Sequence, residues 1–236
     1  MLRTLTIFLL AATAHAAIHL EASTCASGST STVTTSAIDG TAGTNHLIVI
    51  FEVRFTTLAT PTDSTSANTY TKLNTVTNSS TLHAIYYAEN ATVSSTQTFT
   101  IPNGVATFPA ICVMIFSGVA TASSFDQQST GGTNNGTSVQ PGASGLPSQD
   151  NELVVSGLAF AASITGTAVA TPTMTITNTA AYSAGNNFGQ SAAYYIQTSA
   201  ASVNPTWSWS TGSQVNCSIA TFKPALPKIV HRTPQQ

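Results

Sequence analysis

The sequence of 236 residues contains very little charge. Lys, Arg, Asp and Glu together make up 6% of the chain, against roughly a quarter of an ordinary soluble domain. The net charge is −2, so the chain lacks the basic excess that nucleic acid or anionic lipid would attract. The shortage of Lys and Glu argues against a helical bundle, and a hydrophobic content of 42% argues against a charged disordered chain.

Cysteine is also scarce, with only Cys25, Cys112 and Cys217. Their spacing does not resemble a zinc site, and we expect neither a metal nor another cofactor. Cys112 and Cys217 both lie in apolar, strand-like segments, which leaves two alternatives open. They either form a disulfide or remain two buried thiols, and we favour the thiols. Cys25 is expected to be free or to pair between chains.

Long apolar runs are absent apart from one short run at the N-terminus. Arg3 precedes an apolar run over residues 5–12, and Ala14-His15-Ala16 fits a cleavage site. The run is too short for a bilayer, which needs about 20 apolar residues. We therefore predict a signal peptide at 1–16 and a secreted protein, extracellular or at the cell surface. No transmembrane segment is expected after its removal.

The sequence does contain many short runs of the β type, separated by Gly, Pro, Asn and Ser. The strongest covers residues 46–55, where one face is apolar throughout. The other face begins with Ile48 and Ile50 and continues with Glu52 and Arg54. A run that is apolar on both faces at its start predicts a central strand that emerges toward solvent at Glu52 and Arg54.

The whole pattern predicts an all-β protein without amphipathic helices. Branched Thr, Val and Ile side chains suit a pleated, half-buried surface, and residues 77–80 are a predicted hairpin turn. We predict an antiparallel two-sheet β-sandwich, jelly-roll-like, with about ten strands and one long loop. The expected strands are 33–38, 46–55, 68–76, 82–88, 92–101, 105–119, 152–161, 171–179, 188–197, 203–210 and 215–223.

The expected sandwich domain covers residues 30–224. Residues 17–29 form an N-terminal segment that is a candidate strand for donation to another subunit. Residues 121–150 contain many Gly, Asn and Pro but no strand signal, so we predict a long loop, with an interdomain linker as the alternative. Residues 225–236 are predicted to be a flexible tail.

Several short motifs resemble the Ser/Thr-rich β-sandwich domains of secreted bacterial surface proteins and some phage virion proteins. The resemblance spans residues 30–224 and implies a fold and a setting, but no activity. The motifs are Asn45-His46-Leu47-Ile48-Val49, Asp63-Ser64 with Asn68-Thr69-Tyr70, Tyr86-Tyr87-Ala88, Ile115-Phe116-Ser117-Gly118-Val119, Glu152-Leu153-Val154-Val155 and Ala220-Thr221-Phe222-Lys223-Pro224.

Few side chains are suited to catalysis. Glu52 and Glu89 both end predicted strands and are the carboxylate pair that we would test for glycoside hydrolysis. We favour the interpretation that they keep strand ends soluble. His46 and His83 could act as bases, but no serine elbow and no orienting acid accompany them. We therefore predict no catalytic residues and no enzyme activity.

Aromatic residues are the better candidates for ligand binding. Trp207 and Trp209 lie two residues apart, so their rings share one face of a strand. Flat rings suit the CH faces of sugars, and Tyr86 and Tyr194 complete the candidate set. The alternative, which we favour for the Trp pair, is that both rings fill the core between sheets.

These observations favour an exported, non-catalytic structural surface protein: a filament, coat or virion subunit that assembles through β-sheet contacts. Sheet edges with few charges lack the repulsion that prevents edge pairing. The expected partners are further copies of the chain or other surface or virion subunits. A carbohydrate-binding or adhesion module, with glycans as partners, is the first alternative, and a glycoside hydrolase is the second.

Overall fold

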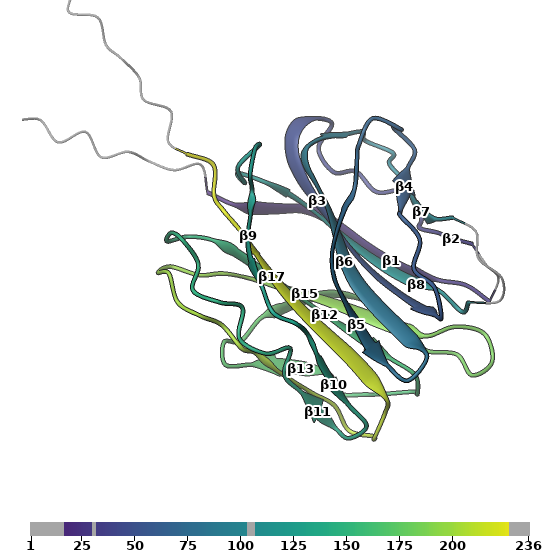
Figure 1. Ribbon diagram of the computed structural model, residues 1–236. Coiled ribbons are helices and arrows are strands. Elements are labelled where there is room, and N and C mark those ends of the chain that lie inside the picture. The colour runs from purple at the N-terminus through teal and green to yellow at the C-terminus, as the bar shows by residue number, and fades with distance from the viewer. Residues whose placement is uncertain (1–16, 30–31, 103–106, 227–236) are drawn as a thin grey trace, which may run out of the picture.

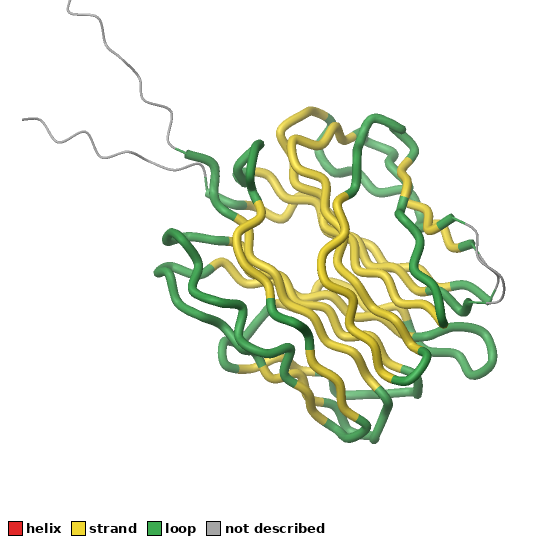
Figure 2. The backbone as a smooth tube through the Cα atoms, in the orientation of Figure 1, coloured by secondary structure: helices red, strands yellow, loops and turns green. Residues whose placement is uncertain are grey.

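The computed structural model describes residues 17–29, 32–102 and 107–226. These residues form 17 strands in four antiparallel sheets (Figure 1). Figure 2 shows only strands and loops, and none of the described residues forms a helix that could cross a membrane. The all-β prediction is therefore confirmed. The predicted signal peptide at 1–16 and residues 227–236 of the predicted tail lie outside the described residues.

Two large sheets are built by consecutive halves of the chain. The first has the order β1-β8-β3-β6-β5 and the second the order β10-β17-β12-β15-β14, with β9 also paired to β17. The first sheet comprises β1 (His19–Ser27), β8 (Ala110–Ser117), β3 (Gly43–Phe55), β6 (Thr81–Val93) and β5 (Thr71–Asn78). The second comprises β9 (Phe125–Gln128), β10 (Gly132–Asn134), β17 (Val215–Phe222), β12 (Leu153–Phe160), β15 (Gly189–Ile196) and β14 (Thr175–Ala180).

Each large sheet is covered on its outer face by a small three-stranded sheet. The first small sheet has the order β2-β7-β4 and the second the order β11-β16-β13. Their strands are β2 (Val33–Thr34), β7 (Phe99–Ile101), β4 (Thr62–Asp63), β11 (Ser138–Val139), β16 (Thr206–Ser208) and β13 (Ala168–Ala170).

The four sheets form successive layers around three large apolar cores and one smaller cluster in the described residues. The inner faces of the two large sheets share one core, in which Leu47 and Phe51 meet Leu153 and Phe222. The two small sheets enclose the other cores against the outer faces. Central strands are therefore buried on both faces, which explains why their sequences are apolar on both faces. The strand orders show two packed antiparallel sheets but do not establish a jelly-roll topology.

The two halves of the chain repeat the same topology, which the sequence did not predict. β2 to β8 of the first half correspond in order and pairing to β11 to β17 of the second, and β1 corresponds to β9 and β10. The register also repeats. Leu47 lies opposite Phe116 in the first half, and Leu153 lies opposite Phe222 in the second.

The contacts between the halves follow an approximate two-fold symmetry. Tyr87 packs edge-on against Phe222 with ring centroids 5.3 Å apart, and Tyr194 packs edge-on against Phe116 at 5.5 Å. Each half thus packs one tyrosine, from β6 or from β15, on a phenylalanine of the other half. Such reciprocal contacts characterise a two-fold interface between identical subunits; here both partners belong to one chain.

Three predictions about local structure need correction. β3 is a central strand as predicted, but it does not emerge toward solvent. Glu52 and Arg54 are 0% and 1% exposed, and Arg54 Nε lies 3.6 Å from Glu52 Oε1. The loop between β3 and β4 covers this face, where Ala59 N donates to Glu52 Oε1 at 3.2 Å. The connection between β7 and β8 covers Arg54, whose Nε donates to Thr107 Oγ1 at 3.0 Å. A sequence pattern does not reveal such cover.

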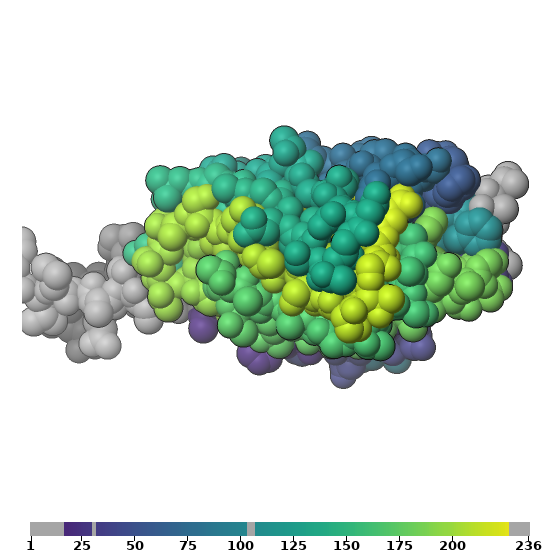
Figure 3. Space-filling view, turned by 90° about the horizontal axis from the view of Figure 1, so that it is seen from below, coloured from purple at the N-terminus to yellow at the C-terminus, as the bar shows by residue number. Residues whose placement is uncertain are grey.

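The segment 121–150 is not a strandless loop. It contains β9, β10 and β11, and both β9 and β10 pair with the buried strand β17. Figure 3 shows this segment in teal beside the yellow C-terminal strand. The three strands are short and polar, and their pairing depends on partners far along the chain, so no local pattern marks them.

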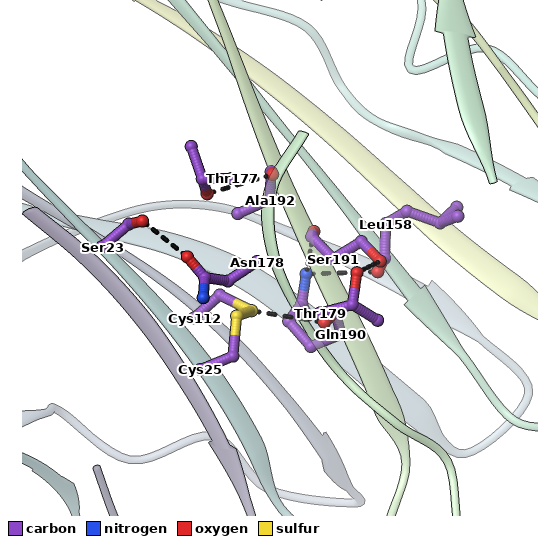
Figure 4. The surroundings of a disulfide bond; sticks show 10 residues. All are labelled: Ser23, Cys25, Cys112, Leu158, Thr177, Asn178, Thr179, Gln190, Ser191 and Ala192. Carbon is purple, nitrogen blue, oxygen red and sulfur yellow. Dashed lines mark hydrogen bonds between the residues drawn. A yellow bond between two sulfur atoms is a disulfide. The ribbon is translucent and has the colours of Figure 1, made fainter. Parts of the chain in front are cut away.

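The disulfide joins Cys25 to Cys112, and Cys217 is a buried free thiol. The favoured prediction of a buried thiol is right for Cys217 but wrong for Cys112, which pairs with Cys25 within the chain. A bridge between Cys112 and Cys217 is also wrong, because the two side chains lie in different cores. Cys25 lies opposite Cys112 in β1 and β8 of the same sheet (Figure 4). The segment 17–29 is thus bound into its own sheet and is not available for donation.

Candidate functional site

The predicted tryptophan pair is part of the core. Trp207 is 0% exposed and Trp209 is 5% exposed, and both belong to the core beneath the second small sheet. The indole Nε1 of Trp207 donates a hydrogen bond of 2.9 Å to Ser156 Oγ on β12. The two rings therefore anchor β16 and its neighbours to the large sheet and offer no surface to a glycan.

The two candidate tyrosines lie apart from the tryptophans and from each other. Tyr86 is 2% exposed and belongs to the core beneath the first small sheet. Burial is the main reason why the pKa of its hydroxyl is raised. Tyr194 lies in the other large sheet and packs on Phe116. The structure does not bring the predicted ligand-binding set together.

The carboxylates considered for glycoside hydrolysis are also separated. Glu52 is buried on the outer face of β3, and burial raises its pKa to about 7. Glu89 follows Ala88 on β6 and its carboxylate accepts hydrogen bonds from Ser124 N and Oγ, at 2.7 and 2.8 Å. Side chains alternate between the faces of a sheet, so the two carboxylates face different layers and cannot flank one bond.

His83 is hydrogen-bonded to a serine, but this pair is buried inside the molecule. His83 Nε2 lies 2.7 Å from Ser218 Oγ, and its Nδ1 lies 3.0 Å from the carbonyl oxygen of Glu52. The ring is fully buried, and burial lowers its pKa to about 4. The neutral ring connects the two large sheets and is closed to a substrate. Nor does the described part of the chain gather three His, Cys, Asp or Glu around a metal position.

An aromatic pocket of about 210 Å³ opens at one end of the molecule. Phe55 ends β3 and Phe108 precedes β8, while Tyr182 and Phe188 come from the connection between β14 and β15. The rings of Phe108 and Phe188 meet edge-on with centroids 6.4 Å apart. Phe55 is 40% exposed, so the pocket presents an aromatic wall to solvent.

The polar groups around the aromatic pocket already have partners. The amide of Asn187 donates to the carbonyl oxygens of Ala181 and Phe188, at 2.6 and 2.7 Å. The amide of Asn186 donates to Ser183 Oγ at 3.0 Å. Because these amides shape the connection itself, the surface left for a ligand or partner is apolar.

A second exposed apolar side chain lies far from this pocket. Leu146 is 67% exposed, and the segment before it is hydrogen-bonded to the connection that follows β15. Ser144 N donates to the carbonyl oxygen of Val203 at 2.9 Å, and Ser144 Oγ accepts from Val203 N at 3.1 Å. Val203 follows the C-terminal end of β15, whereas Phe188 directly precedes its start. The aromatic pocket and Leu146 therefore lie toward opposite ends of a strand about 25 Å long.

The outer strands of both sheets contain irregularities in their pairing. The pairing of β1 shifts between Leu20 and Ala22, that of β5 between Lys72 and Thr75, and that of β14 between Ile176 and Asn178. Bulges twist an edge away from a flat partner and so discourage edge-to-edge pairing.

No protein-family model, curated protein or solved structure matches the chain. Its candidate sites therefore rest on its own geometry. Sequence reasoning missed Phe55, Phe108, Phe188 and Leu146, because a single aromatic or Leu in a loop is not distinctive. The only sequence signal is the asymmetry between the halves, where residues 181–188 replace the short hairpin turn 79–80 of the first half.

Proposed function

We propose that the protein is an exported, non-catalytic structural subunit of a surface filament, coat or virion, and that its copies associate head to tail. The observation that carries this proposal is the pairing of an open aromatic pocket at one end with the exposed Leu146 toward the other. The Cys25–Cys112 disulfide supports export, because disulfides persist in oxidising compartments.

The chemistry of the two surfaces is complementary. A branched aliphatic side chain inserted among Phe55, Phe108 and Phe188 would remove both partners' apolar area from water. Within one molecule, the two surfaces are too far apart to meet. Contact between copies is therefore heterologous, and repetition of such a contact produces open chains when the rotation does not close a ring.

This mode of assembly replaces the β-sheet contacts expected from the low charge. Bulges in β1, β5 and β14 make these edges poor templates for a further strand. Side chains also bond to the edge of β5, where Gln128 Oε1 accepts from Asn74 N at 3.0 Å. The ends of the sandwich are thus better contact surfaces than its edges.

The experiment is sedimentation velocity on the disulfide-bonded chain from residue 17 over a wide concentration range. We expect the mass of the wild type to rise with concentration. Leu146→Ser and Phe55→Ser should each leave monomers, and the double variant should resemble the single ones because both changes disrupt one contact.

Leu226→Ser is the matched control, because it removes an exposed Leu, 75% exposed, without changing Leu146 or the lining of the aromatic pocket. It should assemble like the wild type. A wild type that stays monomeric at the highest concentration, or assembly that persists in both Leu146→Ser and Phe55→Ser, would contradict the proposal.

A further inference from the structure

A second pocket, of about 390 Å³, lies at a corner of the second half. It is bordered by the connection between β13 and β14 and by the connection that follows β15. Its volume falls within the range of about 300–1,000 Å³ that is typical of small-molecule sites. This corner pocket is separate from the aromatic pocket, whose Phe188 lies at the other end of β15.

The corner pocket has polar side chains without partners. Gln197 is 2% exposed, yet neither its Oε1 nor its Nε2 has a hydrogen-bond partner in the described residues. Asn204 Oδ1 is likewise buried and unpartnered. Leaving buried donors and acceptors unpaired is costly, so such groups call for a partner from outside the chain.

At the matching corner of the first half, the amide in the connection between β4 and β5 has partners, although Gln97 Nε2 in the connection between β6 and β7 is buried without one. There Asn68 occupies the connection between β4 and β5, and its Oδ1 accepts from Thr92 N at 2.8 Å. Asn68 Nδ2 donates to the carbonyl oxygen of Thr92 at 2.9 Å and to Asp63 Oδ2 at 3.0 Å. Asn68 in the connection 64–70 is thus paired with neighbouring strands, whereas the shorter connection 171–174 offers no partner to the Gln197 side chain or to Asn204 Oδ1.

The lining of the corner pocket is uncharged. Besides the two amides it includes the hydroxyls of Thr171, Ser199 and Ser202 and the ring of Tyr195. Amides can donate and accept simultaneously, which suits neighbouring hydroxyl groups of a polyol, and an aromatic ring offers an apolar face beside them. An anionic ligand would find no cationic side chain in this lining, and a metal ion would find no carboxylate.

We propose that the corner pocket binds a neutral saccharide, with Gln197 and Asn204 hydrogen-bonding its hydroxyls and Tyr195 contacting its CH face. The corner pocket shares no residues with the aromatic pocket, although its Val203 is hydrogen-bonded to Ser144, two residues from Leu146. The corner pocket lies at the opposite end of β15 from the aromatic pocket and does not include Trp207 or Trp209.

The test is affinity electrophoresis of the disulfide-bonded chain in gels with laminarin, xylan or galactan, followed by calorimetry with the retained polysaccharide. Heparin serves as the charged comparison. We expect retention by at least one neutral polysaccharide and none by heparin. Gln197→Leu should weaken binding at least tenfold, because a site built to bond hydroxyls loses its partner group.

Two further measurements separate a binding role from a structural one. Gln197→Leu should leave Tm unchanged or higher, since it removes an unpaired buried amide, whereas a fall in Tm would reveal an internal partner and contradict the proposal. Ser202→Ala, at the exposed rim, should weaken binding without any change in folding. Asn90→Ala, at the matching corner of the first half, is the control and should bind like the wild type.

The proposal is overturned if the wild type binds none of the three neutral polysaccharides at about 1 mM in saccharide units, the range of very weak affinity. It is equally overturned if Gln197→Leu and Ser202→Ala bind with wild-type affinity, or if only heparin is retained.

Discussion

The two halves of the molecule have the same strands in the same order, and they differ mainly in their connections. β4 and β5 are joined by residues 64–70, whereas β13 and β14 are joined by 171–174. The turn 79–80 between β5 and β6 has the connection 181–188 as its counterpart. The shorter connection opens the corner pocket, and the longer one supplies Tyr182 and Phe188 to the aromatic pocket.

The comparison shows how one scaffold acquires different surfaces. The paired strands and the reciprocal Tyr–Phe contacts need only a repeated apolar pattern. The connections are free to vary in length because they contribute little to the shared core, and candidate binding groups occur where they vary. The second half therefore contributes the polar pocket and most of the aromatic one, while the matching connection of the first half pairs the amide of Asn68.

The largest expected effect concerns the outermost strand of each half. A disulfide connects β1 to β8, whereas β9 and β10 are bound to β17 without one. The double variant Cys25→Ala, Cys112→Ala should lose about 4 kcal/mol in the free energy of unfolding, because the bridge closes a loop with a sequence separation of 87. Urea unfolding measures this loss.

Hydrogen exchange then shows which strands are less protected once the disulfide is removed. Without the disulfide, the amides of β1 should exchange as readily as those of β9 and β10, so that the two outer strands become alike. Cys217→Ala is the control for loss of a thiol and should cost about 1 kcal/mol. Unchanged protection of β1 in the double variant would show that its pairing alone holds it.

The sequence was sufficient for the fold class and for the central strands. The alternation over 46–55 correctly predicted a central strand, and the turn over 77–80 is confirmed, with β5 ending at Asn78 and β6 beginning at Thr81. The burial of Glu52 and Arg54 and the short strands β9 to β11 could not be predicted, since both depend on segments that are distant in sequence.

The second expected effect tests how closely the halves match at their interface. Phe51 on β3 and Gly157 on β12 hold corresponding positions, and a Cβ at Gly157 would lie 2.3 Å from the Phe51 ring. Gly157→Ala should therefore destabilise the protein by about 2 kcal/mol through overpacking. Thermal or urea unfolding gives the value.

A smaller side chain opposite Gly157 should restore part of this loss. Combined with Phe51→Leu, Gly157→Ala should cost less than it does alone, which a double-mutant cycle detects as coupling. Gly212→Ala is the matched control, because the nearest atoms to its Cβ are 3.8 Å away. If the two changes are strictly additive, Gly157 and the Phe51 ring do not pack tightly against each other, and the prediction is wrong.

The candidate sites were harder to predict than the fold. Trp207 and Trp209 looked suited to a ligand because a strand pattern fixes which residues share a face, but not whether another sheet covers that face. Conversely, Gln197 and Asn204 are ordinary polar residues in the sequence. Their interest comes from the absence of a hydrogen-bond partner, which only the assembled structure reveals.

The smallest expected effect distinguishes the halves by pH. His46 precedes Leu47 in the first half, and Glu152 precedes Leu153 at the matching position of the second. Both are buried. Burial lowers the pKa of His46 below its usual 6.5, and burial, assisted by a hydrogen bond to Asp126, raises the pKa of Glu152 from 4.5 to about 7.

The two positions should therefore affect stability in opposite directions. Folded Glu152 retains its proton to a higher pH than unfolded Glu152, so its contribution is present below pH 4.5 and is lost as pH rises through about 7. Folded His46 releases its proton at a lower pH than unfolded His46, so its contribution is present above pH 6.5 and is lost as pH falls. Relative to wild type, Glu152→Gln should gain stability as pH rises, and His46→Gln should gain stability as pH falls. Urea unfolding between these limits measures both differences, and the buried groups common to all three proteins, including Glu52 and His83, cancel in them. Differences with the same pH slope in both variants would show that the matched positions do not have opposite electrostatic roles.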